Sequence, residues 1–423
     1  MRLLFVSSLY PPYELGGYEQ LCHEVAAELS TRGHDVRVLT SRYGVKSSRD
    51  IYVGNISRSL YLMADIHYYK PLDFFFKRNR QEAKNLAELK DAVNRFQPNI
   101  IMFWGMFALS HNLPSWAERC MPGRVVYYLG SYWPLDEDLH ASYWKMSTNR
   151  TQLDWIKNPF RTVALEQLKR EGYPPALKLD NAICCSKYVR DKLAQAGKIA
   201  PDAKVIYSCI DPKPFLESEK LTIRKVPGNV YRLLYFGRLV PEKGVHTAIE
   251  ALGVLKKNGH ADQLELTILG DGHPDYLKHL RQRAHDLDIE NLVHFEGKVP
   301  RAEIPHHLTS HDIFLSTSIW PEPFGRTIVE AMLAGLVVLG SDVGGSREIF
   351  QYYAEEMLFQ PEDAHELANR ILRVTRDPAL YNNLVKKGME LALNHFTMAP
   401  MVDEIEKFLL EASSKVTPND KLR

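Results

Sequence analysis

An alternation of short apolar runs and amphipathic helices, present in two series, most limits what this chain can fold into. Leu3–Val6 is continuously apolar, which is typical of a strand covered on both faces. Gly16-Gly17 follows, then a helical stretch with an apolar face at 21–29, and then a strand-like run at Val36–Leu39. A strand, a helix and a strand in this order predict a parallel, doubly wound sheet.

The second series starts after a break at 212–229, where prolines and a glycine surround a charged segment. It opens with a strand at Tyr231–Phe236, a helix at Val245–Lys257 and a strand at Leu264–Leu269. The same order of elements predicts a second doubly wound sheet.

We therefore predict an α/β fold with two doubly wound, Rossmann-like domains that face each other across a deep cleft. The first domain is expected at 1–215 and the second at 225–396, with a helix at 398–413 that packs back on the first. The segment 131–172 has no clean period and is predicted to be an inserted loop and helix region.

The composition of the 423 residues excludes several classes of protein. Hydrophobic residues make up 45% and charged residues 25%, which is ordinary for a globular protein, and the net charge of +1 gives no reason to expect nucleic acid. The cysteines are odd in number and form no C-x-x-C pair, which fits a reduced intracellular protein. The start lacks the pattern of a signal peptide, and the longest apolar stretch is shorter than the roughly 20 residues that span a bilayer. We expect a cytoplasmic protein.

Two glycine-containing loops are expected at carboxyl ends of strands, where open α/β sheets bind ligands. Gly16-Gly17 precedes a helix, and the free N–H groups of that helix end attract an anion such as phosphate. In the loop Gly237–Gly244, Arg238 provides a planar fork for phosphate oxygens and Lys243 a mobile positive charge. Together the two side chains would hold a diphosphate and neutralise it as it leaves. The alternative for Gly16-Gly17 is a plain tight turn, and the alternative for the loop Gly237–Gly244 is a basic turn exposed to solvent.

A third loop carries two carboxylates. Glu322 is kept in a loop by Pro323 and Gly325, whereas Glu330 lies on the helix that begins near Arg326. The two acids therefore meet different parts of a ligand, and the helix start adds backbone donors for an anion. The alternative is a capped helix with surface acids.

The residues of these three loops together are typical of a site that binds a sugar linked to a diphosphate. Departure of the phosphate would then be helped by fixed charges rather than by a metal ion. No D-x-D element is placed in these loops for a divalent ion, and no His/Cys cluster has the spacing of metal ligands, so neither metal nor cofactor is expected.

At this point the sequence resembles the family-4 retaining glycosyltransferases, which have the GT-B fold. The similarity covers most of the chain and runs in order and spacing through PPYELGGYEQ, GRLVPEKG, LTILGDG and PEPFGRTIVEAMLAGLVVLGSDVGGSREI. The last of these segments contains the E-x7-E element of the family. The resemblance implies retention of anomeric configuration and no metal requirement.

The resemblance also implies roles for individual residues. Gly16-Gly17 would approach the donor phosphates and sugar, Arg238 and Lys243 would bind the diphosphate, and Arg238, Lys243 and Glu322 would be the catalytic group. Glu322 would bond the hydroxyls of the donor sugar, and Glu330 those of the ribose. The remaining donor-binding positions are Gly237, Gly297, Val299, Phe324, Gly325, Arg326 and Thr327.

One departure from the family concerns the acceptor side. Many members have His-Asp after the strand that here is 125–129, whereas this chain has Gly130-Ser131, and a second frequent histidine is replaced by Trp104. Gly130, Ser131 and Trp133 are the candidate acceptor residues.

The predicted activity is transfer of a sugar from a nucleotide diphosphate donor, UDP- or GDP-linked, to a hydroxyl of a glycan, a lipid-linked molecule or a small molecule. The alternatives are a non-catalytic sugar-nucleotide-binding or scaffold subunit, and a sugar-nucleotide 2-epimerase. A nicotinamide dehydrogenase is disfavoured because the G-x-G-x-x-G fingerprint is missing from the first loop.

Aromatic and basic residues interleave in the segment His67–Arg80. This pattern predicts peripheral contact with anionic lipid at the inner membrane face, or with a lipid-linked acceptor. A partly exposed loop and helix start is the alternative.

Overall fold

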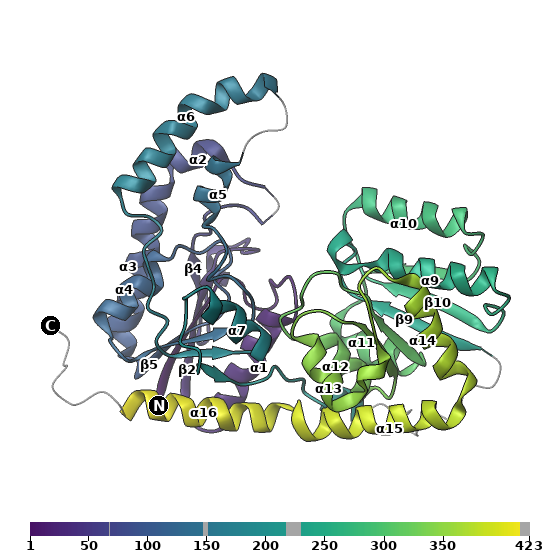
Figure 1. The fold of residues 1–423 in the computed structure, drawn as a ribbon. Coiled ribbons are helices and arrows are strands. Elements are labelled where there is room, and N and C mark those ends of the chain that lie inside the picture. The colour runs from purple at the N-terminus through teal and green to yellow at the C-terminus, as the bar shows by residue number, and fades with distance from the viewer. Residues whose placement is uncertain (67, 147–150, 217–229, 415–423) are drawn as a thin grey trace. The chain divides into compact units, whose positions relative to one another are not determined.

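The computed structural model describes residues 1–66, 68–146, 151–216 and 230–414, without the side chains of 151–156. It divides into two α/β units (Figure 1). Unit 1 comprises Met1–Cys185, Val189–Ile206 and the chain from Val402 onward, and unit 2 comprises Ser186–Tyr188 and Tyr207–Met401. Most of the predicted break at 212–229, and His67 of the aromatic and basic segment, lie outside the described residues.

The sheet of unit 1 is parallel except at one edge. The strand order is β3-β4-β2-β1-β5-β6-β7-β8, and β3 is antiparallel to β4. Because β1 pairs with β2 on one side and β5 on the other, the switch point of this sheet lies between β1 and β5. The strands are β1 (Arg2–Ser7), β2 (Asp35–Ser41), β3 (Tyr52–Val53), β4 (Ile56–Leu60), β5 (Ile100–Phe103), β6 (Val125–Leu129), β7 (Ala182–Cys184) and β8 (Lys204–Val205).

Helices connect these strands and cover the sheet (Figure 1). The apolar face of the first helix lies in the core, with Leu21, Val25 and Leu29 at most 1% exposed. The helices of this part of the chain are α1 (Gly17–Thr31), α2 (Pro71–Phe76), α3 (Arg78–Phe96), α4 (Asn112–Cys120), α5 (Leu139–Lys145), α6 (Thr151–Arg170) and α7 (Lys187–Gln195), with a 3-10 turn at Ser48–Asp50.

The last described helix, α16 (Met398–Ser414), contacts the turn that follows α1. Arg32 pairs with Asp403 at 2.6 Å and with Glu406 at 3.0 Å, and His34 Nε2 lies 2.8 Å from Glu406. The chain end is therefore tied by charge to the beginning of unit 1.

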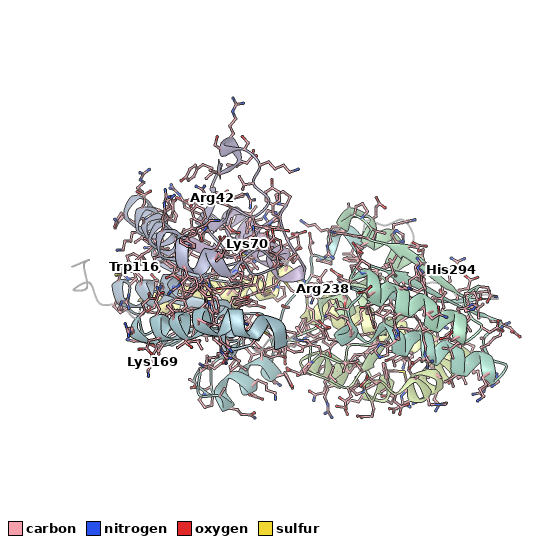
Figure 2. All side chains as sticks on the ribbon, turned by 90° about the horizontal axis from the view of Figure 1, so that it is seen from above. Arg42, Lys70, Trp116, Lys169, Arg238 and His294 are labelled. Atoms are coloured by element: carbon pink, nitrogen blue, oxygen red, sulfur yellow. The ribbon has the colours of Figure 1, made fainter. Side chains whose placement is uncertain are left out.

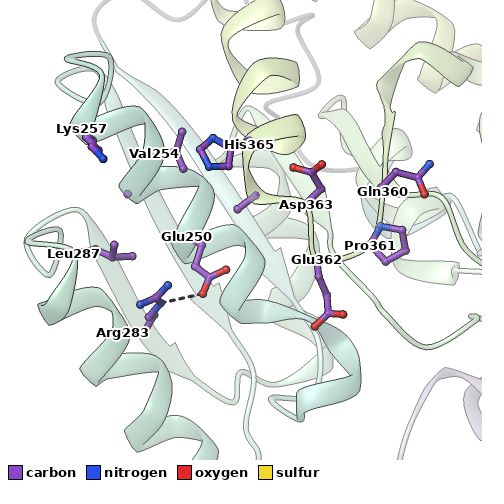
Figure 3. A pocket seen from close by; sticks show the side chains of 12 residues that line it. Glu250, Val254, Lys257, Arg283, Leu287, Gln360, Pro361, Glu362, Asp363 and His365 are labelled. Carbon is purple, nitrogen blue, oxygen red and sulfur yellow. Dashed lines mark hydrogen bonds and ion pairs between the residues drawn. The ribbon is translucent and has the colours of Figure 1, made fainter.

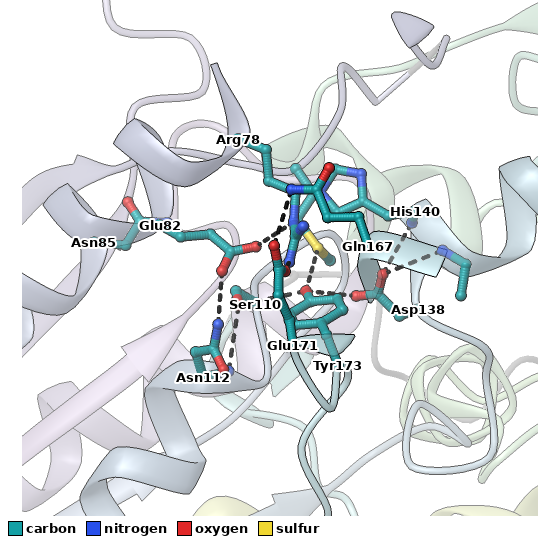
Figure 4. Close-up of polar contacts among 12 residues, drawn as sticks. Arg78, Glu82, Asn85, Ser110, Asn112, Asp138, His140, Gln167, Glu171 and Tyr173 are labelled. Atoms are coloured by element: carbon teal, nitrogen blue, oxygen red, sulfur yellow. Dashed lines mark hydrogen bonds and ion pairs between the residues drawn. The ribbon is translucent and has the colours of Figure 1, made fainter. Parts of the chain in front are cut away.

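The segment 131–172 forms α5 and α6, which pack with α2 around a small apolar cluster of their own. Phe74 and Trp144 are each 2% exposed, and Leu168 is 3% exposed in this cluster. A polar network beside it joins these helices to α3 and α4 (Figure 4). The periodicity of the sequence could not predict this arrangement because the cluster forms between segments that are distant along the chain.

Arg78 is the centre of that network. It is 3% exposed and pairs with Glu82 at 3.0 Å and with Glu171 at 2.6 Å. Tyr173 donates its hydroxyl to Asp138 at 2.9 Å. Burial, with the positive charge of Arg78 as a smaller cause, lowers the pKa of His140 to about 3. The buried imidazole is therefore neutral near pH 7.

Unit 2 contains a fully parallel sheet of order β11-β10-β9-β12-β13-β14. Its switch point lies between β9 and β12, because β9 pairs with β10 on its other side. The strands are β9 (Tyr231–Phe236), β10 (Leu264–Leu269), β11 (Val293–Gly297), β12 (Ile313–Ser316), β13 (Val337–Ser341) and β14 (Leu358–Phe359).

The helices of unit 2 flank this sheet on both faces, as a doubly wound fold requires (Figure 1). They are α8 (Lys213–Leu216), α9 (Val245–Lys257), α10 (Pro274–Asp286), α11 (Ile304–Thr309), α12 (Arg326–Leu333), α13 (Ser346–Tyr353), α14 (Ala364–Arg376) and α15 (Pro378–His395), with 3-10 turns η2 (Pro241–Lys243), η3 (Arg301–Glu303) and η4 (Glu355–Met357). Both units thus have the predicted Rossmann-like α/β architecture. Among the described helices, none is long and apolar enough to cross a membrane.

Candidate functional site

The three predicted catalytic residues gather in unit 2 at the carboxyl ends of β9 and β12. The loop after β9 carries Arg238 and Lys243, and the loop after β12 carries Glu322. This is the switch point of the sheet, where two neighbouring strands send their connections to opposite faces and leave room for a ligand.

Close backbone contacts fix the loop after β9. A side chain at Gly270 would place its Cβ 1.8 Å from the carbonyl oxygen of Gly237, and one at Gly272 would lie 1.9 Å from that of Leu239. Tyr235 donates its hydroxyl to the carbonyl oxygen of Arg238 at 3.0 Å. Arg238 is exposed, and its guanidinium makes no hydrogen bond or ion pair with the residues that the structure describes. It is therefore available to an anion.

The turn that carries Lys243 is held by the chain that follows β12. The backbone N–H groups of Ile319 and Trp320 both donate to the carbonyl oxygen of Glu242 at 2.9 Å. The hydroxyl of Thr317 donates to the carbonyl oxygen of Lys243 at 3.0 Å. Gly244 has a φ of 62°, and a Cβ there would lie 2.1 Å from the carbonyl oxygen of Thr317, so only glycine fits.

These contacts bring Lys243 and Glu322 together. The ammonium group of Lys243 forms an ion pair with the carboxylate of Glu322, although the two residues are 79 positions apart. Their side chains are 20% and 19% exposed, so both remain within reach of a ligand. A cation and an acceptor for hydroxyl groups thus lie side by side.

Two glycines after β13 support the Glu322 loop. The N–H of Gly345 donates to the carbonyl oxygen of Glu322 at 2.7 Å. A Cβ at Gly344 would lie 2.5 Å from the same oxygen, so the backbones touch directly. Sequence reasoning quoted these glycines within a motif but did not place them in the site. Their position between a strand and a helix was the available signal.

The helix α12 starts directly after this loop. Gly325 is its N-cap with a φ of 102°, and Arg326 and Thr327 form its first turn. No side chain caps the helix start, so its N–H groups suit an anion. Phe324 is 3% exposed and packs its ring against Tyr207 and Phe396, which leaves only its backbone for a ligand.

Glu330 lies deeper on α12 and is 1% exposed. Its Oε1 forms an ion pair with Arg301 of η3, while its Oε2 is buried and has no hydrogen-bond partner in the described structure. A buried carboxylate oxygen without a partner is costly, and a hydroxyl group of a ligand would satisfy it. Arg301 was missed by sequence reasoning because nothing local links it to a residue 29 positions away.

The loop predicted to meet the base leaves β11. Gly297 has a φ of 75°, and a Cβ there would meet nothing within 4 Å. Its carbonyl oxygen accepts the N–H of Gly270 at 2.8 Å, whereas Val299 is only partly buried. The loop thus borders the loop after β10 and has open space beside it.

The first glycine loop lies in unit 1. A Cβ at Gly16 would meet nothing within 4 Å, so there is open space beside its backbone. The N–H of Gly16 donates to Glu19 at 3.1 Å, and burial raises the pKa of this carboxyl group. The predicted anion-binding end of α1, which begins at Gly17, therefore already holds an acidic side chain of its own.

The contacts of Tyr18 explain why this chain has glycine at position 130, where many members of the family have histidine. Tyr18 of α1 donates its hydroxyl to the carbonyl oxygen of Tyr128 and accepts the N–H of Gly130 at 3.3 Å. A Cβ at Gly130 would lie 2.5 Å from the ring of Tyr18. Trp104 is fully buried behind this ring, 6.1 Å away between centroids.

The other two acceptor candidates differ in exposure. Ser131 is partly exposed beside Gly130. Trp133 is 6% exposed and packs on His111 at 5.4 Å and on Tyr127 at 6.3 Å. With so little of the side chain exposed, the indole ring offers little surface for stacking on a sugar.

The described residues contain no group of three His, Cys, Asp or Glu side chains that could hold a metal ion. A separate hollow of about 640 Å³ lies between α9, α10 and the loop before α14 (Figure 3). It is lined by residues such as Glu250 and Arg283, which pair at 2.9 Å, and by none of the predicted donor residues.

The fold defines a class of protein with two Rossmann-like domains, each built on a parallel sheet with a switch point. Two family models match consecutive parts of the chain: Glycosyltransferase Family 4 at residues 15–213 and Glycosyl transferases group 1 at residues 218–391. These matches, with the fold, support a glycosyltransferase of the GT-B type.

Individual relatives agree with this class. An amylovoran biosynthesis glycosyltransferase of Erwinia amylovora is 31% identical over 51% of this chain and 52% of its own length, so this match spans about half of that relative. An uncharacterized glycosyltransferase of Methanocaldococcus jannaschii is 24% identical over 89% of this chain and 90% of its own. The N-acetyl-alpha-D-glucosaminyl L-malate synthase of Bacillus anthracis is 22% identical over 96% of both chains.

Solved structures share the fold across nearly the whole chain. The Anabaena protein HepE, solved with UDP and glucose, has a TM-score of 0.65 and 24% identity, covering 97% of this chain and 99% of that one. Sucrose-phosphate synthase of Thermosynechococcus elongatus has a TM-score of 0.70 and 19% identity, covering 98% and 100%. At these identities the structural likeness establishes the fold alone.

Proposed function

We propose that this protein is a retaining, metal-independent glycosyltransferase that uses a nucleoside diphosphate sugar as donor and a hydroxyl group as acceptor. The observation that carries the proposal is the meeting of Lys243 and Glu322 at the switch point of unit 2, with Arg238 in the same loop as Lys243 and without an ion pair to the described residues. A pair of cations suits a diphosphate, and a carboxylate suits sugar hydroxyls.

In this proposal the cations act on the leaving group. Arg238 and Lys243 bind the diphosphate and stabilise the charge that grows on it as the bond to the anomeric carbon breaks. The acceptor oxygen attacks from the same face, and its proton passes to the departing phosphate, so the configuration is retained. Two fixed cations supply the charge that a metal ion would otherwise provide, which is the basis for proposing metal independence.

The carboxylates orient the donor. Glu322 exchanges its ion pair with Lys243 for hydroxyl groups of the sugar, while Lys243 turns to the phosphates. Glu330 accepts a ribose hydroxyl at Oε2, which has no partner among the described residues. The base lies along the loop of Gly297 and Val299, and the similar Anabaena structures with UDP and with UDP-glucose make uridine the first base to test.

Thermal unfolding with UDP, GDP, ADP and dTDP tests the donor site, because a bound ligand raises the midpoint. We expect a shift with one nucleoside diphosphate, and its loss in Arg238→Ala and in Lys243→Ala. Lys256→Ala, an exposed lysine of α9, is the matched control and should keep the shift. No shift with any nucleotide near millimolar concentration would count against the donor site.

Turnover with the matching sugar conjugate tests the reaction. Removing one charge-stabilising donor typically costs about 100-fold or more in rate, and we expect this loss in both variants. Near wild-type transfer in both would remove the proposed roles of Arg238 and Lys243. Activity that survives exhaustive chelation is the expected result for metal independence. A cytoplasmic location remains a prediction from the sequence.

A further inference from the structure

Large apolar side chains are exposed together on α2 and α6 of unit 1. Leu72 is 63% and Phe76 is 79% exposed on α2, and Phe160 is 50% and Val163 is 59% exposed on α6. Met146, at the end of α5, is 63% exposed. Exposure of this degree on neighbouring helices is unusual unless the surface binds something.

These side chains form one surface, here called the α2–α6 face. Leu72 and Phe76 lie one helical turn apart on α2, and Phe160 and Val163 are three positions apart on α6, so each pair shares a helix side. Phe75 joins the pairs, because its ring lies 5.9 Å from that of Phe160.

The α2–α6 face is not needed to complete the core beneath it. That core is closed by Phe74 and Trp144, each 2% exposed. Arg78 of α3 also pairs with Glu171, the residue that follows α6, and so ties the end of α6 to α3 (Figure 4). The helices that carry the exposed side chains are therefore already held in place, and the exposed side chains do not contribute to packing in this core.

Basic side chains border the apolar ones. Lys70, Lys77 and Arg80 are exposed on the segment that contains α2, and Figure 2 shows Lys70 in this part of unit 1. Asp73 is the acid among them and pairs with Lys77 at 2.9 Å. A surplus of positive charge around exposed aromatic residues complements a bilayer with anionic headgroups.

We propose that the α2–α6 face docks onto an anionic phospholipid bilayer, with Leu72, Phe76, Phe160 and Val163 at the depth of the headgroups. The docking itself is independent of the reaction, but its consequence for the acceptor rests on the proposed function. The α2 segment follows the carboxyl end of β4, and α5 and α6 follow the carboxyl end of β6, which is the edge that also carries Gly130. An acceptor anchored in the bilayer would thus be presented at the acceptor edge.

Sedimentation of the full chain with vesicles tests the docking. The vesicles are phosphatidylcholine alone, or an equimolar mixture with phosphatidylglycerol. We expect binding to the anionic vesicles and not to the neutral ones, weakened by added salt. The double variants Leu72→Ser/Phe76→Ser and Phe160→Ser/Val163→Ser should each lower the affinity by at least about tenfold, given the apolar surface removed.

The matched control is Leu410→Ser, which removes a side chain of 50% exposure from α16 and should bind like the wild type. Unchanged binding in both double variants, or no binding by the wild type, would overturn the proposal. So would a wild-type dimer in sedimentation equilibrium that the double variants lose, because the face would then bind a second copy of the chain.

Two further readouts separate this test from that of the proposed function. Circular dichroism and thermal unfolding establish that each variant is folded. The midpoint shift with nucleotide is measured without vesicles and uses residues of unit 2, so it should persist in the double variants. If the double variants keep both the midpoint shift with nucleotide and the wild-type binding to vesicles, only the docking proposal is refuted. If the wild type shows no midpoint shift with any nucleotide, the donor site is refuted instead.

Discussion

Replacing Glu330 by glutamine tests whether this carboxylate holds the ribose of the donor. Glu330 is 1% exposed, pairs with Arg301 through Oε1 and keeps Oε2 buried without a partner in the described structure. Glutamine preserves the size and shape of the side chain and removes only its charge and one acceptor oxygen. A change in ligand affinity would therefore report on the contact rather than on packing.

The size of the effect follows from the hydrogen bond that is lost. A bond from a hydroxyl group to a charged acceptor contributes about 1.5–3 kcal/mol, so affinity should fall by about 10- to 150-fold. Stability should not fall with it. The Arg301 side chain is 44% exposed and can be hydrated, and a neutral amide costs less to bury than a carboxylate.

Titration calorimetry on both proteins separates the possibilities. The ligands are the nucleoside diphosphate found by unfolding and its 2′-deoxy and 3′-deoxy forms. We expect the wild type to bind at least one deoxy form more weakly, and Glu330→Gln to bind it as well as the parent nucleotide. Glu356→Gln, an exposed acid of η4, is the control. Deoxy penalties of equal size in the wild type and Glu330→Gln would refute the ribose contact.

Three further perturbations have outcomes fixed by local geometry. Gly244→Ala should lower the free energy of unfolding, measured in urea, by about 1–3 kcal/mol or more, because it combines a positive φ with a Cβ 2.1 Å from a carbonyl oxygen. The control Gly259→Ala has a φ of 72° and nothing within 4 Å of its Cβ, so it should lower the free energy of unfolding clearly less. Equal losses in the two variants would contradict the steric argument. His140, with a pKa lowered to about 3, binds a proton in the unfolded chain near pH 6.5 that it does not bind when folded, so it removes about 1.4 kcal/mol of stability per pH unit as pH falls from 6.5 toward 3. Nearby carboxyl groups with raised pKa values act in the opposite direction, so the comparison with His140→Gln isolates this effect, and identical slopes of stability against pH would disprove it. Gly130→Ala should lower the melting temperature because its methyl group would lie 2.5 Å from the ring of Tyr18, and adding Tyr18→Ala should relieve that particular clash, as a double-mutant cycle would reveal.

The sequence could predict the elements and the loops of the donor site because both depend on local patterns. Lys243 follows a strand-like apolar run within a glycine-bounded loop, and Glu322 stands in a proline- and glycine-rich loop before a helix. Parallel strands bring such loops to one edge, so a shared site could be expected. The ion pair between the two side chains could not be predicted from the sequence, because it depends on how the two loops contact each other.

Other contributors had no local signature. Arg301 reaches Glu330 from a different strand connection, and Gly270 and Gly344 act through the backbone of loops that are distant in sequence. The α2–α6 face is a similar case. The sequence marked the segment that contains α2, but α6 joined it only through packing, since Phe160 meets Phe75 across 5.9 Å.

The glycine at position 130 illustrates how such non-local contacts alter the meaning of a departure from a family pattern. Taken alone, a missing side chain indicates a lost function. In the structure, Tyr18 fills the space that a side chain would take, and its hydroxyl joins the backbone on both sides of Leu129 by bonding to Tyr128 and Gly130. A residue from α1 and a glycine after β6 are therefore mutually dependent. It follows that a histidine placed at position 130 alone would collide with Tyr18, so the polar contact expected there cannot be restored by a single substitution.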